Sequence, residues 1–212
     1  MKALKVILYS IGGLALLYVI LGLVGPKNYH VERSMVVNGS SDLVWNEVSH
    51  FRNWERWSPW QEMEPDVKHI YEGEDGAVGS VMKWEGDKNK TGTGQMTFSA
   101  MDPNKKINYD LMFIVPFESK SNGYFTFEGA ENNKTKVIWV NEGDISFAMR
   151  PMMMFMNMDK MLGGDFERGL VRIDSVVTVA ANQQKEEEAA KLQMTEEETA
   201  MDSISAPEKG GK

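Results

Sequence analysis

Four of the six tryptophans of the chain fall within one short segment, Ser41–Trp60 (SDLVWNEVSHFRNWERWSPW). A turn that ends in serine precedes this segment. Val44, Val48 and Phe51 then follow at i, i+4 and i+7, which predicts a capped amphipathic helix. A further helical turn comes next, and Pro59 is expected to end it. So much large apolar surface must close over an apolar partner, so we expect a lid above a cupped sheet, with a cavity beneath it.

The composition fits one globular domain with appendages and excludes several classes of function. The chain has 212 residues, 42% of them hydrophobic, and a formal net charge of −8, which argues against a nucleic-acid-binding surface. The absence of cysteine excludes disulfides, thiolate metal ligands and a cysteine nucleophile. His30, His50 and His69 are far apart in the sequence, so we expect no metal site and no cofactor.

The N-terminal region carries a candidate membrane span. Val6–Val24 is a run of 19 residues without a charge, preceded by Lys2 and Lys5. As a helix it would extend for about 28 Å, close to the thickness of the bilayer core. A cleavable signal peptide is the alternative, but no A-x-A-like cleavage site precedes Gly25-Pro26. We therefore expect residues 1–27 to form a single-pass anchor in the cell membrane. The lysines before the span favour a cytoplasmic N-terminus, with the domain outside the cytoplasm.

Alternating apolar and polar residues predict seven strands joined by tight turns, which is typical of an antiparallel meander. The first strand, Tyr29–Val37, precedes the tryptophan-rich segment. The other six are Val67–Glu72, Ser80–Glu85, Thr93–Met101, Lys106–Val115, Gly123–Glu128 and Lys136–Asn141. Positions of one parity carry aromatic and methionine side chains, Met82 and Met96 among them, so one face of the sheet should be strongly apolar.

From Pro151 onward the spacing of apolar residues becomes helical. Met158, Leu162, Phe166, Leu170, Ile173 and Val177 follow one another at steps of three or four residues. We expect an α+β domain over residues 28–181, in which this long helix packs across the antiparallel sheet. Residues 182–212 carry eight acidic and four basic side chains and no aromatic one, which predicts an acidic disordered tail.

Four stretches of the sequence carry a family resemblance. They are VERSMVVNGSSDLVWNEVSHFRNWERWSPW (Val31–Trp60), the G-x-x-x-x-W of Gly79–Trp84, TKVIWVNEGD (Thr135–Asp144) and MNMDKMLGGDFERGL (Met156–Leu170). Together they resemble the polyketide cyclase/dehydrase-like branch of the START-like superfamily, also called SRPBCC, and in particular its membrane-anchored bacterial members. The resemblance covers about Tyr29 to Val179. It implies a helix-grip fold, in which a curved antiparallel sheet and a long C-terminal helix enclose a hydrophobic cavity.

Our first hypothesis is a membrane-tethered binding module that holds a lipid or another hydrophobic small molecule in the cavity between the sheet and the helix. We expect aromatic residues of the lid and sheet, and apolar residues of the Met-rich region and long helix, to line the cavity. They are Trp57, Trp60, Trp84, Phe98, Tyr109, Phe113, Phe125, Trp139, Met153, Met158, Leu162 and Phe166. The resemblance implies no catalytic set, because the matched residues are mainly packing and capping positions.

Two other functions remain open. A cyclase- or dehydratase-like enzyme would use acid–base chemistry in the cavity, which requires a carboxyl group buried there. The candidate acids are Glu85, Asp110, Glu142, Asp144 and Asp165. A co-chaperone-like module would instead bind a protein partner through its outer surface, using the acidic tail and exposed methionines. The sequence carries no signal for the oligomeric state.

Overall fold

The structure, a computed structural model, describes residues 2–205 and follows the predicted order of elements. Its elements are α1 (Lys2–Val24), β1 (Asn28–Val37), α2 (Ser41–Ser49), the 3₁₀-helix η1 (Phe51–Arg56), α3 (Pro59–Met63), β2 (Lys68–Glu72), β3 (Val81–Glu85), β4 (Thr93–Asp102), β5 (Lys106–Val115), β6 (Ser119–Ala130), β7 (Lys134–Asp144), α4 (Arg150–Met153) and α5 (Met158–Ser205). The strands lie within a few residues of the predicted ranges.

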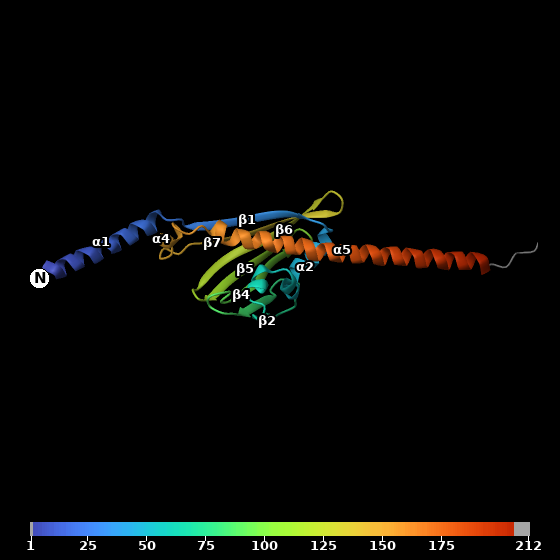
Figure 1. Cartoon of the computed structure of the whole chain (residues 1–212), viewed down its shortest axis with the longest axis horizontal. Helices are drawn as coiled ribbons and strands as arrows, with labels where there is room; N and C mark the ends of the chain where they lie inside the picture. The colour runs from blue at the N-terminus through green and yellow to red at the C-terminus, as the bar shows by residue number, and fades with distance from the viewer. Residues whose placement is uncertain (1, 206–212) are drawn as a thin grey trace, which may run out of the picture.

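The seven strands form one antiparallel sheet in the order β1-β7-β6-β5-β4-β3-β2. Helix α5 runs along this sheet (Figure 1), α2 packs against α5, β6 and β7, and α3 packs against α5. Strand β1 closes next to β7 because the chain returns to the first strand after the meander. The predicted α+β arrangement, a curved antiparallel sheet with a long C-terminal helix, is confirmed.

The tryptophan-rich segment is built from three short helical pieces. Ser40 caps α2, its hydroxyl accepting a hydrogen bond from the amide of Leu43 at 3.5 Å. Pro59 was expected only to end a helical turn, but it also begins α3. Proline fits the first position of a helix because its missing N–H would have no partner there. The break before Pro59 lets the chain fold back toward the sheet.

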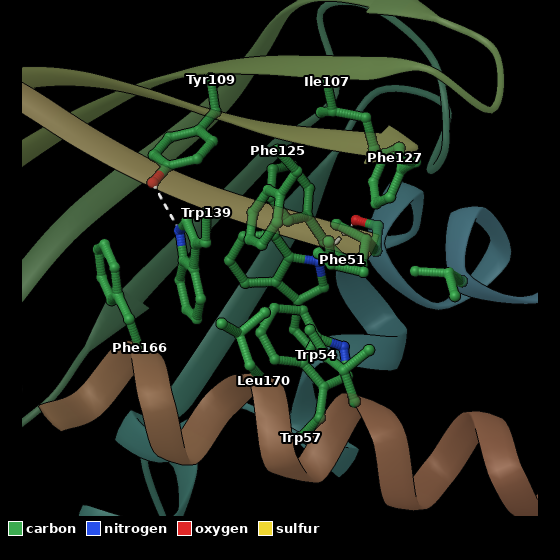
Figure 2. Close-up of a cluster of buried hydrophobic side chains, with 14 of the residues drawn as sticks. Phe51, Trp54, Trp57, Ile107, Tyr109, Phe125, Phe127, Trp139, Phe166 and Leu170 are labelled. Carbon is green, nitrogen blue, oxygen red and sulfur yellow. Dashed lines mark hydrogen bonds between the residues drawn. The ribbon is translucent and has the colours of Figure 1, made fainter. Parts of the chain in front are cut away.

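The core between the sheet and α5 is aromatic. Trp139 of β7 is stacked on Phe166 of α5, with ring centroids 4.2 Å apart, and on Phe125 of β6 at 4.8 Å. Its indole nitrogen donates a hydrogen bond to the hydroxyl of Tyr109 at 3.0 Å. Figure 2 shows these side chains converging with Trp57 from the lid. The rings therefore fill the middle of the space that the sheet and helix enclose.

Helix α5 continues far beyond the domain, which corrects one expectation. Residues 182–205 are helical, where we expected a disordered tail, and the rest of the predicted tail, 206–212, lies outside the described residues. The described side chains there, residues 182–196, are exposed, so packing does not explain this helix. The composition of this segment explains the helix, since Glu, Ala, Lys and Gln are strong helix formers. The pair Glu187 and Lys191, spaced i and i+4, adds a favourable charge interaction.

Among the described residues, α1 is the one helix that is long and apolar enough to cross a membrane. Its length and composition are equally those of a signal sequence near an N-terminus. Most of its side chains are exposed in the structure, and its last turns contact the segment around α4. The helix leaves the domain at the end of the sheet opposite to the extension of α5 (Figure 1).

Candidate functional site

An apolar cavity of about 190 Å³ lies between the lid and the β2–β5 half of the sheet. Eight of its lining residues are apolar: Trp54, Trp60, Val67, Met82, Trp84, Met96, Leu111 and Phe113. Six are polar: Glu55, Ser58, Gln61, His69, Lys90 and Thr91. The volume is smaller than the ~300 Å³ at which pockets for drug-sized ligands begin, so the cavity fits one ring or a short acyl segment.

The register of the sheet places the floor of this cavity. Met82 lies opposite Met96, and Met96 lies opposite Leu111, so the three side chains form a row across β3, β4 and β5. Methionine side chains are flexible and polarizable, so they adapt to apolar ligands of different shape. The row therefore provides a soft floor rather than a rigid one.

Trp84 forms a wall of the cavity and is held from three sides. Its indole nitrogen donates to the carbonyl of Thr91 at 3.1 Å, and its ring meets Phe113 edge to face with centroids 5.4 Å apart. Its third neighbour is Gly94, where an added Cβ would lie 2.4 Å from the ring. Only glycine fits that position without moving the indole.

The polar side of the lining centres on Glu55. Its carboxylate accepts a hydrogen bond from the Tyr71 hydroxyl at 2.7 Å and lies 3.6 Å from Nδ1 of His69. Burial, and then the hydrogen bond to Glu55, raise the pKa of Tyr71 above its usual value. Gln61 donates to the carbonyl of Pro65, but its buried Oε1 has no partner among the described residues. The carboxylate of Glu55 is therefore the acceptor that the polar lining presents.

A second hollow of about 370 Å³ lies at the start of β1, beside the segment that joins α4 to α5. It is more open to solvent, and its lining includes Tyr29, His30, Met153 and Met158. The Tyr29 hydroxyl donates to Oδ1 of Asn141 at 2.8 Å, and burial raises the pKa of Tyr29. The lining of this hollow is mixed, because four methionines stand beside polar side chains that include His30 and Asp159.

The twelve predicted lining residues lie in three places: the apolar cavity, the second hollow and the core. Trp60, Trp84 and Phe113 line the apolar cavity, and Met153 and Met158 line the second hollow. Leu162 is partly buried against the core. The other six pack against one another as buried core: Trp57, Phe98, Tyr109, Phe125, Trp139 and Phe166. A ligand role for any of the twelve stays a prediction.

Several residues that line the apolar cavity were not among the twelve predicted from the sequence. Met82 and Met96 were placed on the apolar face of the sheet by their period of two, so the signal for them was present. Trp54 has the same sequence signal as Trp57, and only the rotation of the short helix η1 decides which of the two reaches the cavity. Glu55 and His69 are 14 positions apart in the chain and meet only through the fold.

The five candidate acids all lie outside the cavity lining. Four of them are exposed at the surface: Glu85, Asp110, Glu142 and Asp144. Asp165 is partly buried on α5 and forms an ion pair with Arg168 at 2.5 Å. Within the part of the chain that the structure describes, no three His, Asp or Glu side chains converge in a way that could hold a metal ion.

The seven-stranded antiparallel sheet with the long helix α5 across it is a helix-grip architecture. The family model described as polyketide cyclase / dehydrase and lipid transport matches residues 29–178, and the chain belongs to this family. The match covers β1 to the last buried turn of α5, which is the whole body of the domain. A search among curated proteins found no match to the sequence.

Solved structures that resemble the domain share little sequence with it. A protein of unknown function from Staphylococcus aureus has a TM-score of 0.54 at 11% identity, covering 73% of this chain and 98% of its own. A Mesorhizobium loti protein has a TM-score of 0.52 at 14% identity, covering 71% and 97%. Norcoclaurine synthase from Thalictrum flavum, a point mutant in complex with a transition-state analogue, has 0.53 at 12%, covering 72% and 96%. These likenesses show the fold alone.

We expect the domain to lose stability in alkali because of its buried phenols. Burial raises the pKa of Tyr109, although the hydrogen bond from Trp139 partly opposes this effect. Below pH 10 the phenol is neutral in both states and its contribution is fully present. Above pH 10 only the unfolded chain ionises, so the free energy of unfolding falls by about 1.4 kcal/mol per pH unit for each such tyrosine.

Tyr109→Phe separates the effect of this phenol from general alkaline damage. The variant should lose about 1–3 kcal/mol at pH 7, because the indole N–H of Trp139 is left without an acceptor. Its stability should then fall less steeply between pH 10 and 11 than that of the wild type. Denaturant titrations of the detergent-solubilised chain at several pH values measure both quantities. Equal alkaline slopes in the two proteins would show that Tyr109 does not contribute.

Proposed function

We propose that this protein is a membrane-anchored binding module for a lipid or another hydrophobic small molecule, which it holds in the cavity between the lid and the β2–β5 half of the sheet. The observation that carries the proposal is the lining of this cavity. Eight of its fourteen lining residues are apolar and six are polar, and most of the exposed lining surface is apolar. Such an arrangement is typical of sites that bind small apolar ligands and orient them by one polar group.

The polar groups indicate the kind of ligand. Glu55 places a carboxylate, which accepts hydrogen bonds, at the lining of the cavity. A ligand with a hydroxyl or amide N–H would donate to Glu55 while its apolar part meets Met82 and Met96. We therefore favour an amphiphilic ligand with a hydrogen-bond donor at one end over a pure hydrocarbon.

Helix α1 supplies the anchor in this proposal. Its 23 residues extend for about 34 Å at ~1.5 Å per residue, enough to cross the bilayer core. The exposed apolar side chains along it would face lipid rather than protein. Lys2 and Lys5 at its start favour a cytoplasmic N-terminus and place the domain on the other side of the membrane.

Fluorescence quenching tests the binding site directly, because Trp54, Trp60 and Trp84 line the cavity. A short-chain brominated fatty alcohol combines an apolar chain, a hydroxyl donor and a quencher. We expect it to quench these tryptophans saturably in the detergent-solubilised chain. Trp84→Phe should remove a large part of the quenched signal. Quenching that rises linearly with the probe and is unchanged in Trp84→Phe would show partition into detergent instead of binding.

An acid–base enzyme is a second candidate, and one observation favours it. Glu55 and His69 lie side by side at the cavity, a spacing from which a proton could move to or from a bound ligand. If the cavity is catalytic, His69→Gln should retain a different molecule from the wild type, since substrate would accumulate in place of product. Mass spectra of the two purified proteins compare these molecules. Identical contents would favour simple binding.

A further inference from the structure

The end of the sheet from which α1 leaves carries an unusual concentration of exposed phenylalanines. In the part of the chain that the structure describes, the exposed phenylalanines are Phe117, Phe147 and Phe155, with 72%, 41% and 85% of their surface accessible. Phe117 is in the β5–β6 turn, and the other two lie between β7 and α5. Further exposed apolar residues lie close to them in the sequence: Ile114, Val115, Met152 and Met154.

The strand register brings these segments to one end of the molecule. Asn28, the first residue of β1, pairs with Asp144 at the end of β7. Asn122 of β6 pairs with Glu142, so the first residues of β6 reach the level of the end of β7. Neighbouring strands are ~4.8 Å apart, which places the β5–β6 turn within one or two strand spacings of the segment after β7.

The last turns of α1 pack directly against this end. The Tyr18 hydroxyl donates to the carbonyl of Ala148, and the ring of Phe147 lies against Gly22 so closely that a Cβ there would come within 2.7 Å. Arg150 donates to the carbonyls of Ile145 at 3.1 Å and Gly22 at 3.5 Å. The end of α1 is therefore held against the domain, because it forms an interface with residues 145–150.

This interface sets the depth of the surrounding residues if α1 crosses a membrane. Tyr18 is six residues before Val24, or about 9 Å along the helix axis at ~1.5 Å per residue. With Val24 at the edge of the hydrocarbon core, Ala148 lies below the level of the headgroups. Lys27 is exposed directly after the helix, where its ammonium group would meet lipid phosphates. The apolar surface around the junction would then face lipid.

We propose that Phe117, Phe147 and Phe155 form a docking face that inserts into the headgroup and acyl boundary of the bilayer that holds α1. This proposal rests on the membrane anchoring proposed above. The occupant is lipid because the face is continuous with the apolar surface of α1 through the contacts of Tyr18 and Gly22. Docking fixes the orientation of the domain, with the β3–β4 and β5–β6 turns toward the membrane. Aromatic side chains at this level are typical of membrane interfaces.

Spin labels can measure the depth of this face in the intact chain, which contains no cysteine. Single variants Phe117→Cys, Phe147→Cys and Phe155→Cys, together with Leu14→Cys in α1, are labelled and reconstituted into phosphatidylcholine vesicles. Val78→Cys is the matched control, because Val78 is 59% exposed in the β2–β3 connection at the other end of the sheet. Phe117 and Phe155 decide the result, since Phe147 also packs against α1.

Collision rates with oxygen and with a water-soluble nickel chelate report the depth of each label. We expect the labels at positions 117 and 155 to lie about 5–10 Å inside the boundary, and the label at position 78 to be in water. If the labels at positions 117 and 155 are as exposed to water as the label at position 78, while the label at position 14 lies inside the bilayer, docking is overturned and the anchor remains. An aqueous label at position 14 would overturn the anchor and docking together. If labels at position 155 of two chains show spin–spin coupling, and this coupling disappears on dilution with unlabelled chain, the face contacts a second copy and the proposal is overturned.

Discussion

Replacing Trp139 with alanine is expected to lower the free energy of unfolding by about 3–5 kcal/mol. The side chain is 1% exposed, and its ring contacts Phe125 and Phe166 by stacking and Trp57 edge to face. Trp139 lies on β7, which pairs with both β1 and β6, so these contacts join the sheet to α5 and to the lid. The substitution leaves a large hole at the centre of the core and removes the donor to Tyr109.

Trp45→Ala is the control for this experiment. Trp45 also comes from the tryptophan-rich segment, but it is only partly buried and meets one ring, Phe127, at 5.8 Å. We expect a loss of about 1–2 kcal/mol, near the middle of the range for point substitutions. Denaturant unfolding followed by circular dichroism measures both variants. Equal losses would show that the aromatic core is not organised around Trp139.

Replacing Leu111 with tryptophan is expected to weaken ligand binding about ten-fold or more, a loss of at least ~1.4 kcal/mol. Leu111 lines the cavity in the row formed with Met82 and Met96. An indole at this position would occupy much of the 190 Å³ that the ligand is proposed to fill. The midpoint of quenching by the brominated alcohol measures the change, after correction for the added tryptophan.

Val36→Trp is the matched control for the cavity variant. Val36 lies on β1, at the edge of the sheet, and its side chain is exposed. The same substitution there adds an indole without entering the cavity, so the midpoint should not change. If both variants bind the probe as the wild type does, the ligand site is elsewhere, and the second hollow near Met153 and Met158 becomes the alternative.

The sequence predicted the architecture well because the signals for it are local. Period-two alternation marks β4 and β5 to within a residue, and the three- and four-residue steps from Met158 mark the buried face of α5. The extension of α5 past Ala181 was missed. The acidic composition was taken as a sign of disorder, although the same Glu, Ala and Lys residues favour a helix.

The location of the cavity could not be predicted in the same way. Periodicity shows that Phe125 and Trp84 both face inward, but it does not show which of them is surrounded by other rings and which of them borders a cavity. Phe125 is surrounded by Trp54, Trp57 and Trp139, which fill the centre of the domain. Trp84 is near the edge of the sheet, where the lid does not reach the floor completely, and a space remains. Such a difference depends on contacts between distant segments.

Native mass spectrometry of the full chain, purified in a mild detergent, tests the central claim most directly. The account predicts a hydrophobic small molecule bound to the wild type at one copy per chain. It also predicts that this molecule is largely lost from Leu111→Trp and retained by Val36→Trp. Two results would contradict the proposal that this cavity is a binding site. In the first, the wild-type protein carries no ligand and releases none into organic solvent. In the second, Leu111→Trp retains as much ligand as the wild type.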